Sequence, residues 1–324
     1  MSGRVLATCA TAVFMLSAGC NDAPTQVRES DFPGRLEGQV FGAVGRPFGF
    51  AIAADGRGLL MQLDGHHAAR FGVDVDSVLP QFAALDYNPI DVGFSPDGQL
   101  GYASILDGNR IFVVNMASGA VVDTFAFGAH HHRILVSPAG DRFWVTTIDG
   151  KVYAVDAASG ALLDSAVVGG IVRGIARASD GTLAISNGGM VTLLDGTTLD
   201  RKRVRGIGGT AQDVVYSADG ASILVAFEGN ASVLRFNATT LMPEGRITLP
   251  AGTYPFGMAM SPDGTMLLVS SAMSGRVEVV DVERGRRVRS LDTGGIPRRI
   301  AFSPDGTRAF ISNEGGWIDI VGRD

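Results

Sequence analysis

Cysteine is almost absent from this chain: of its 324 residues only Cys9 and Cys20 are cysteines, and both precede residue 21. The sequence beyond residue 20 therefore has no disulfide, no cysteine-ligated zinc and no cysteine nucleophile. Lysine occurs only as Lys151 and Lys202. No stretch after residue 20 approaches the ~20 consecutive apolar residues with which a helix crosses a bilayer.

Several common functional signatures are also missing. The chain has no Gly-rich phosphate loop, no Gly-x-Ser-x-Gly elbow and no His-Glu-x-x-His motif, so the usual marks of nucleotide binding, serine hydrolysis and zinc proteolysis are lacking. Its net charge is −6, and removal of residues 1–19, which hold one arginine and no acid, makes it −7. This mild negative charge argues against nucleic acid as a partner.

The first twenty residues differ from the rest. Arg4 precedes an apolar stretch at 5–16, which is followed by Ser17-Ala18-Gly19-Cys20, the arrangement of a secretory signal. Ending on Ala-Gly-Cys, it resembles a bacterial lipoprotein signal, although Ser17 stands where an aliphatic residue is usual. We expect a signal peptide at 1–19, a lipidated Cys20 with a linker to 35, and a location in the bacterial cell envelope, periplasmic or at the cell surface. Ordinary secretion is the alternative.

A four-residue phrase recurs along the chain. Ser-Pro-Asp-Gly occurs at 95–98, 261–264 and 303–306. Weaker copies occur at 53–56, 137–140, 178–181 and 217–220. The terminal glycines of the seven copies are 42, 42, 41, 39, 44 and 42 residues apart. A period of about 42 residues matches one four-stranded blade of a β-propeller.

Each unit has the pattern of four strands. In the second unit they are expected at 90–95, 100–106, 110–115 and 120–127, rich in Val, Ile and Phe and separated by Gly, Asn, Asp and Ser. The seventh unit stops after three strands, and residues 36–43 supply the fourth, which closes the ring and removes an open sheet edge. We therefore predict an all-β protein, a single seven-bladed β-propeller spanning residues 36–324.

The first strand of each unit alternates large and small residues. Val92, Gly93 and Phe94 are an example, and the small residue lies five places before the terminal glycine in most units. We expect this alternation because the innermost strands of a propeller crowd around the central axis.

The repeat resembles the YVTN-repeat family of β-propellers, which is related in shape to lactonase-like propellers. The likeness is carried by the Ser-Pro-Asp-Gly turns and by Val-Val-Asn-Met-Ala-Ser-Gly-Ala-Val-Val at 113–122. It covers about residues 36–324, and the fourth and fifth units depart from it most. The resemblance implies an exported or cell-surface propeller but no single function, because the family includes enzymes and proteins without known chemistry.

One end of the predicted channel gathers charged residues. The residues eight and seven places before each terminal glycine begin the inner strands, on the face opposite the Pro-Asp-Gly turns, and should line the channel mouth. These pairs are Phe48/Gly49, Ile90/Asp91, His132/Arg133, Arg173/Gly174, Gln212/Asp213, Phe256/Gly257 and Arg298/Arg299. The candidate ligand-binding residues are Asp91, His132, Arg133, Arg173, Asp213, Tyr254, Phe256, Arg298 and Arg299. Such a set would hold a carboxylate or a phosphate. Alternatively, the two aspartates pair with arginines and merely close the channel.

The five histidines fall on this same face. They are His66, His67, His130, His131 and His132. Adjacent residues of an extended strand point to opposite sides, so the triplet should not converge on one ion. We predict no metal and no other cofactor, with a transition metal at His130 and His132 as the alternative.

Two arginine-rich stretches, 201–205 and 284–289, fall on expected outermost strands. One reading is contact with anionic lipid or polysaccharide. We prefer the other reading, in which the charges keep an exposed strand edge from pairing with another chain.

The expected function is non-catalytic binding. An exported, lipid-anchored propeller would attach to the bilayer through Cys20 and present its mouth face to an envelope protein, a glycan or a small anionic ligand. The enzymatic alternative is a lactonase-like hydrolase or isomerase with Asp91 or Asp213 as its base, because glutamate is absent from the mouth pairs. A third reading is a redox accessory propeller that holds a metal or haem at His132.

Overall fold

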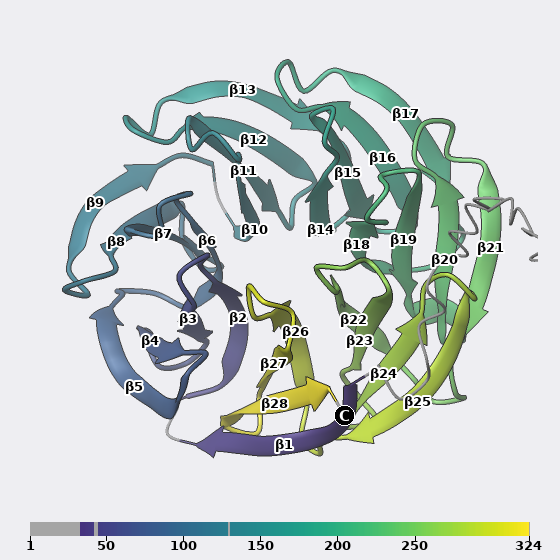
Figure 1. The fold of residues 1–324 in the computed structure, drawn as a ribbon. Coiled ribbons are helices and arrows are strands. Elements are labelled where there is room, and N and C mark those ends of the chain that lie inside the picture. Colours follow the sequence, from purple (N-terminus) through teal and green to yellow (C-terminus); the bar gives the residue numbers. More distant parts are fainter. Residues whose placement is uncertain (1–32, 42–44, 129, 324) are drawn as a thin grey trace, which may run out of the picture.

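The computed structural model describes residues 33–41, 45–128 and 130–323. These residues form seven four-stranded antiparallel sheets arranged as blades around a central axis (Figure 1). The inner strand of each blade contacts the inner strand of the next, and β26 contacts β2 to close the ring. The predicted all-β, seven-bladed propeller is confirmed.

The strands run from the centre outwards in each blade. Blades 1 to 3 consist of β2 (Pro47–Ile52), β3 (Arg57–Gln62), β4 (His67–Gly72) and β5 (Val75–Ala84); β6 (Pro89–Phe94), β7 (Leu100–Ile105), β8 (Arg110–Asn115) and β9 (Val121–Ala126); and β10 (His131–Val136), β11 (Arg142–Thr147), β12 (Lys151–Asp156) and β13 (Leu162–Val167). Blades 4 and 5 consist of β14 (Val172–Arg177), β15 (Thr182–Asn187), β16 (Met190–Asp195) and β17 (Arg201–Gly206); and β18 (Ala211–Tyr216), β19 (Ser222–Phe227), β20 (Ser232–Asn237) and β21 (Pro243–Thr248), with a short 3-10 helix at Glu228–Asn230. Blades 6 and 7 consist of β22 (Pro255–Met260), β23 (Met266–Ser271), β24 (Arg276–Asp281) and β25 (Arg286–Asp292); and β26 (Pro297–Phe302), β27 (Arg308–Asn313), β28 (Trp317–Arg323) and β1 (Pro33–Phe41).

Blade 7 joins the two ends of the chain. β1 pairs antiparallel with β28 and is its outer neighbour, as expected, although it begins at Pro33 rather than at residue 36. Nε2 of Gln39 in β1 donates to Oδ1 of Asp319 at 2.8 Å and to the backbone oxygen of Thr293 at 3.0 Å. Because Thr293 follows the last strand of blade 6 and Asp319 lies in blade 7, the Gln39 side chain connects the closing strand to both blades.

The hydrophobic core lies between neighbouring blades. Phe50 and Ile52 pack toward blade 7, whereas Ala51 between them packs toward blade 2. In the next blade a Cβ on Gly93 would lie 2.8 Å from Cγ2 of Val136 in blade 3. The small residue is therefore required by the adjoining blade, and not by crowding at the axis as the sequence suggests.

The repeated Ser-Pro-Asp-Gly phrase forms the turn between the first and second strands, on what we call the turn face. Oγ of Ser95 donates to Oδ1 of Asp97 at 2.6 Å and accepts from the backbone N of Leu100 at 3.0 Å. Gly98 adopts a φ of 68°, which suits glycine. The four-residue phrase therefore forms a structural turn that is held by its own hydrogen bonds. The opposite side, where the inner strands begin, is the mouth face.

No helix within the described ranges is both long and apolar enough to cross a membrane. The expected signal peptide and Cys20 lie outside the described residues.

Candidate ligand site at the channel mouth

Each inner strand breaks its pairing register at the mouth. In β6 the break falls between Pro89 and Asp91, and in β14 between Val172 and Gly174. The other five inner strands break at the corresponding place. A β-bulge sets two residues opposite one and re-aims their side chains. The breaks fall at the predicted mouth pairs, but the sequence carries no evident signal for them.

Two buried ion pairs fill the channel. Nη1 of Arg299 in blade 7 lies 3.2 Å from Oδ2 of Asp213 in blade 5, and its Nη2 lies 3.5 Å from the backbone oxygen of Arg173 in blade 4. Because blade 7 is adjacent neither to blade 5 nor to blade 4, Arg299 reaches across the axis. Nε of Arg133 lies 3.3 Å from Oδ2 of Asp91 in blade 2. Asp91, Asp213 and Arg299 are only 4%, 2% and 4% exposed.

Each aspartate also holds the backbone of the following blade. Asp91 accepts the backbone N–H of Ile134 at 3.1 Å, and Asp213 accepts that of Met258 at 3.1 Å. A Cβ on Gly174 would lie 2.8 Å from Oδ1 of Asp213, so glycine is needed there for the blades to meet. The pairing of both aspartates with arginines is the arrangement that the channel-closing alternative describes.

Burial shifts the pKa values of three of these channel groups. Desolvation raises the pKa of the Asp91 carboxyl, and the charges of Arg133 and Arg299 oppose that rise. Desolvation and the nearby Arg133 lower the pKa of Arg299 to about 10. Desolvation and three arginines hold the pKa of His132 well below its ordinary value, so its imidazole is neutral. The channel thus contains the charges of Arg133, Arg173 and Arg299 against those of two carboxylates.

At the mouth itself, side chains are matched within blades 1, 2, 5 and 7. The two positions compared are the first residue of the mouth pair and the residue that follows the second strand of the same blade. Arg298 pairs with Glu314 and lies 4.6 Å from the ring centroid of Phe256. Gln212 donates to Oε2 of Glu228 at 2.5 Å. In blades 1 and 2 the corresponding residues belong to one apolar group, formed by Phe48, Leu63, Ile90 and Leu106.

Blade 4 breaks this matching. Arg173 corresponds in position to Arg298, but Gly188 stands where blade 7 has Glu314. Among the described residues no side chain or backbone acceptor bonds the Arg173 guanidinium, and its Nε is buried without a partner. Arg173 is therefore the one channel arginine in the described structure without a carboxylate.

Three glycine pairs lie in the mouth-side segments of blades 4 and 5. They lie at 169–170, 188–189 and 208–209, at the starts of the inner strands of blades 4 and 5 and in the turn between β15 and β16. The backbones approach closely here: a Cβ on Gly170 would lie 3.2 Å from the oxygen of Asn187, and one on Gly189 would lie 3.0 Å from that of Gly209. Little side-chain bulk therefore stands between Arg173 and a ligand. Sequence reasoning missed this feature, although the three Gly-Gly pairs were a visible signal.

The remaining predicted mouth residues are spread around the rim. Phe48 and Phe256 meet edge to face with their centroids 5.7 Å apart, below the guanidinium of Arg298. Tyr254 stands apart from them at 43% exposure. Phe48 and Phe256 therefore form an aromatic contact at the mouth, and Tyr254, directly before β22, is a more exposed side chain of the same face.

The three neighbouring histidines diverge. His131 is fully buried, packs against Phe127 with the ring centroids 4.8 Å apart and the rings tilted, and places Nε2 2.8 Å from the backbone oxygen of that residue. His132 lies in the channel, and His130 is exposed with a φ of 55°. Within the described ranges no three metal-ligating side chains come together. The histidines thus offer no convergent ligand set, and a metal at His130 and His132 stays an untested alternative.

The arginine-rich stretches lie on the outer strands β17 and β25 and the turn before β25. In blade 4, Nη2 of Arg201 donates to the backbone oxygen of Val167 in blade 3 at 2.7 Å. Nε of Arg203 donates to that of Thr239 in blade 5 at 2.8 Å. These arginines link neighbouring blades, a structural role that the sequence does not reveal.

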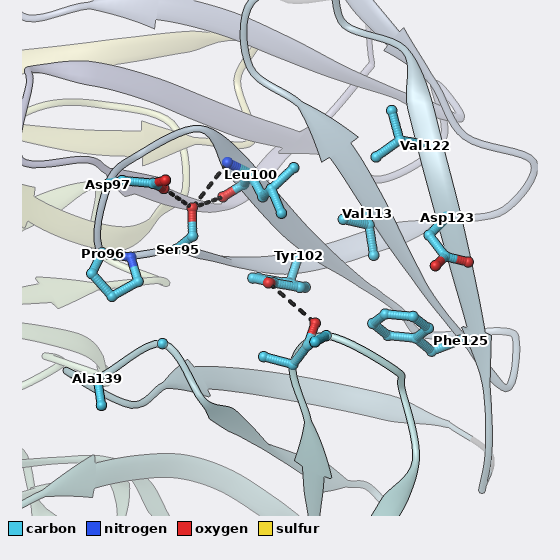
Figure 2. Close-up of a pocket in the computed structure, with 13 residues that line it drawn as sticks. Ser95, Pro96, Asp97, Leu100, Tyr102, Val113, Val122, Asp123, Phe125 and Ala139 are labelled. Atoms are coloured by element: carbon cyan, nitrogen blue, oxygen red, sulfur yellow. Dashed lines mark hydrogen bonds between the residues drawn. The ribbon is translucent and has the colours of Figure 1, made fainter.

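The turn face carries grooves between adjacent blades. The groove between blades 2 and 3 has a volume of about 550 Å³. In Figure 2, Tyr102 and Phe125 line its floor, and the hydroxyl of Tyr102 donates to the backbone oxygen of Ala157 at 3.4 Å. Comparable grooves occur between blades 3 and 4, 4 and 5, and 5 and 6. Their recurrence follows from the repeat, so the feature specific to one blade is the unpaired arginine at the mouth.

Comparison with known proteins supports the fold alone. No family model matches the chain, and no curated protein matches it. A solved structure of hydrazine synthase from Kuenenia stuttgartiensis contains a chain that is similar at 19% sequence identity and a TM-score of 0.78, over 90% of this chain and 100% of that one. At this identity the likeness shows a shared propeller and no shared activity. The resemblance to the YVTN-repeat family stays a prediction.

Proposed function

We propose that this chain is a non-catalytic binding propeller that receives an anionic group, a carboxylate or a phosphate, on Arg173 at the channel mouth. The supporting observation is that Arg133, Arg298 and Arg299 each have a carboxylate partner and Arg173 has none in the described structure. A half-buried guanidinium that has lost part of its water without gaining an acceptor is stabilised by a bound anion.

The contacts of the two aspartates favour binding over hydrolysis. A general base must reach the proton that it removes. Asp91 and Asp213 each engage one arginine and one backbone N–H of the next blade, so neither is free for a substrate without breaking the channel contacts. His132 is a single neutral imidazole and could supply one ligand only, which is weak support for a metal or haem.

The test adds the missing carboxylate. Inorganic phosphate at ten times its dissociation constant should stabilise the wild-type chain by about 1.4 kcal/mol, a rise in Tm of roughly 3 °C. Gly188→Glu should abolish this rise by pairing with Arg173. Gly188→Gln is the matched control, because it suffers the same strain at φ 57° without the charge.

A second pair of variants checks the arginine directly. Arg173→Gln should lose the phosphate effect, whereas Arg246→Gln, at an exposed position on β21, should keep it. Equal phosphate responses in Gly188→Glu, Arg173→Gln and the wild type would overturn the proposal.

We propose further that the chain is exported and acylated at Cys20. Pro33 pairs with Arg323, at the end of β28 on the turn face, so the chain joins the propeller on the side away from the mouth. An acyl anchor would then leave the mouth face pointing away from the bilayer. The wild-type chain should incorporate labelled palmitate and sediment with membranes, and Cys20→Ser should do neither. Absence of label from both proteins would exclude acylation.

A further inference from the structure

Large apolar side chains stand exposed on the mouth face, and six of them fall in two clusters; Phe41 and Tyr87 are the other two. The blade 3–4 cluster consists of Ile148, Val167 and Ile171, which are 36%, 68% and 43% exposed. The blade 6–7 cluster consists of Tyr254, Met273 and Ile296, which are 43%, 73% and 38% exposed. All six lie at strand ends or turns on the mouth side of their blades.

The two clusters flank the channel. Blades 3 and 4 lie across the ring from blades 6 and 7 (Figure 1), and Arg173 is the second residue of β14 in blade 4, two residues after Ile171. Scattered apolar residues are normal on a protein surface, but grouped ones on a functional face indicate an interface. An apolar surface around a desolvated charged residue is also the usual composition of a protein-binding hot spot.

The chemistry of the clusters selects among ligands. A single small anion that reaches Arg173 cannot also cover side chains on both sides of the ring. A glycan would need aromatic faces for stacking, but five of the eight exposed residues are not aromatic, and the three aromatic ones, Phe41, Tyr87 and Tyr254, belong to three different blades. A second copy related by two-fold symmetry would set the same face against itself. The channel carboxylates of such a copy, those of Asp91 and Asp213, are already paired.

We infer that the mouth face binds another protein, which lays an apolar surface on both clusters and places an acidic side chain on Arg173. This inference rests on the proposed anion site and identifies the anion as a side chain of a protein partner. The carboxylate supplies charge-assisted hydrogen bonds and specificity, and the apolar contacts supply buried area.

The probe is a displayed library of random 12-residue peptides, selected on the immobilised full chain. Selected peptides should combine Asp or Glu with flanking aliphatic or aromatic residues. A synthetic winner should bind the wild-type chain at least tenfold more tightly than it binds Gly188→Glu. The double variant Ile171→Ser/Met273→Ser should weaken binding at least tenfold and keep the phosphate response. The matched control is Val122→Ser/Leu162→Ser, at 56% and 50% exposed positions near the turn face, and should bind normally.

Three other results would each overturn a different part of the proposal. A phosphate response without any carboxylate-dependent peptide leaves the anion site standing and overturns the protein partner. Loss of the phosphate response in the wild-type chain overturns the anion site itself. A dimer in sedimentation velocity that Ile171→Ser/Met273→Ser dissociates would identify the occupant as a second copy and overturn the inference.

Discussion

Asp213→Asn and Arg299→Met test the charge balance of the channel. The native channel contains three arginine charges and two carboxylates, with neutral His132. Arg299→Met leaves two charges of each sign, and Asp213 keeps its backbone donors and its attraction to Arg133. Asp213→Asn leaves three positive charges against one negative charge, while the asparagine oxygen can still accept from the next blade.

The two variants should therefore differ in stability. Removing one member of a buried ion pair costs about 3–5 kcal/mol when the remaining charge is uncompensated. We expect Asp213→Asn to lower the free energy of unfolding by about 4 kcal/mol. Arg299→Met should cost about 2 kcal/mol, below that range because Asp213 remains compensated. At roughly 2 °C per kcal/mol for a domain of this size, the Tm should fall by about 8 °C and about 4 °C.

The assay is urea unfolding followed by circular dichroism, with scanning calorimetry for the Tm. The double variant should cost about 1–3 kcal/mol less than the sum of the single variants, because the two side chains are in contact. An Arg299→Met variant that is as unstable as Asp213→Asn, or strictly additive effects, would refute the charge count from which the Arg173 proposal starts.

Three further predictions concern His132, the closing strand and a glycine of the mouth pairs. His132 stays neutral when folded but takes up a proton in the unfolded chain below pH 6.5, so stability should fall with decreasing pH, by about 1.4 kcal/mol from pH 7.5 to 5.5; urea midpoints of His132→Phe should lack this part of the pH dependence. Gln39→Ala removes a donor to buried Asp319 and should cost about 2 kcal/mol in the same assay; an unchanged midpoint would deny Gln39 a role in ring closure. Gly257→Ala places a Cβ 2.2 Å from a backbone oxygen of blade 7 and should cost about 3 kcal/mol. Gly245→Ala has open space and should change stability by less than about 0.5 kcal/mol.

The location of the candidate site could be predicted from the sequence more fully than its chemistry. Counting back from the turn glycines placed Asp91 and Asp213 at the mouth, and both lie in the channel within ion-pair distance of arginines. The count predicted the same role for Arg173 and Arg298, because both occupy the same position of the repeat. Their difference depends on the residue after the second strand, Glu314 in one blade and Gly188 in the other.

The sequence by itself determined the repeat, the number of blades and the closing strand, because strand alternation and turn chemistry are local properties that recur every 42 residues or so. Only the tertiary structure decided which charges remain unpaired. Arg299 and Asp213 are 86 residues apart and meet because the ring brings non-adjacent blades to one axis. The β-bulges that re-aim the mouth residues likewise depend on how each inner strand meets its neighbours, and this contact between blades is not encoded in any single repeat.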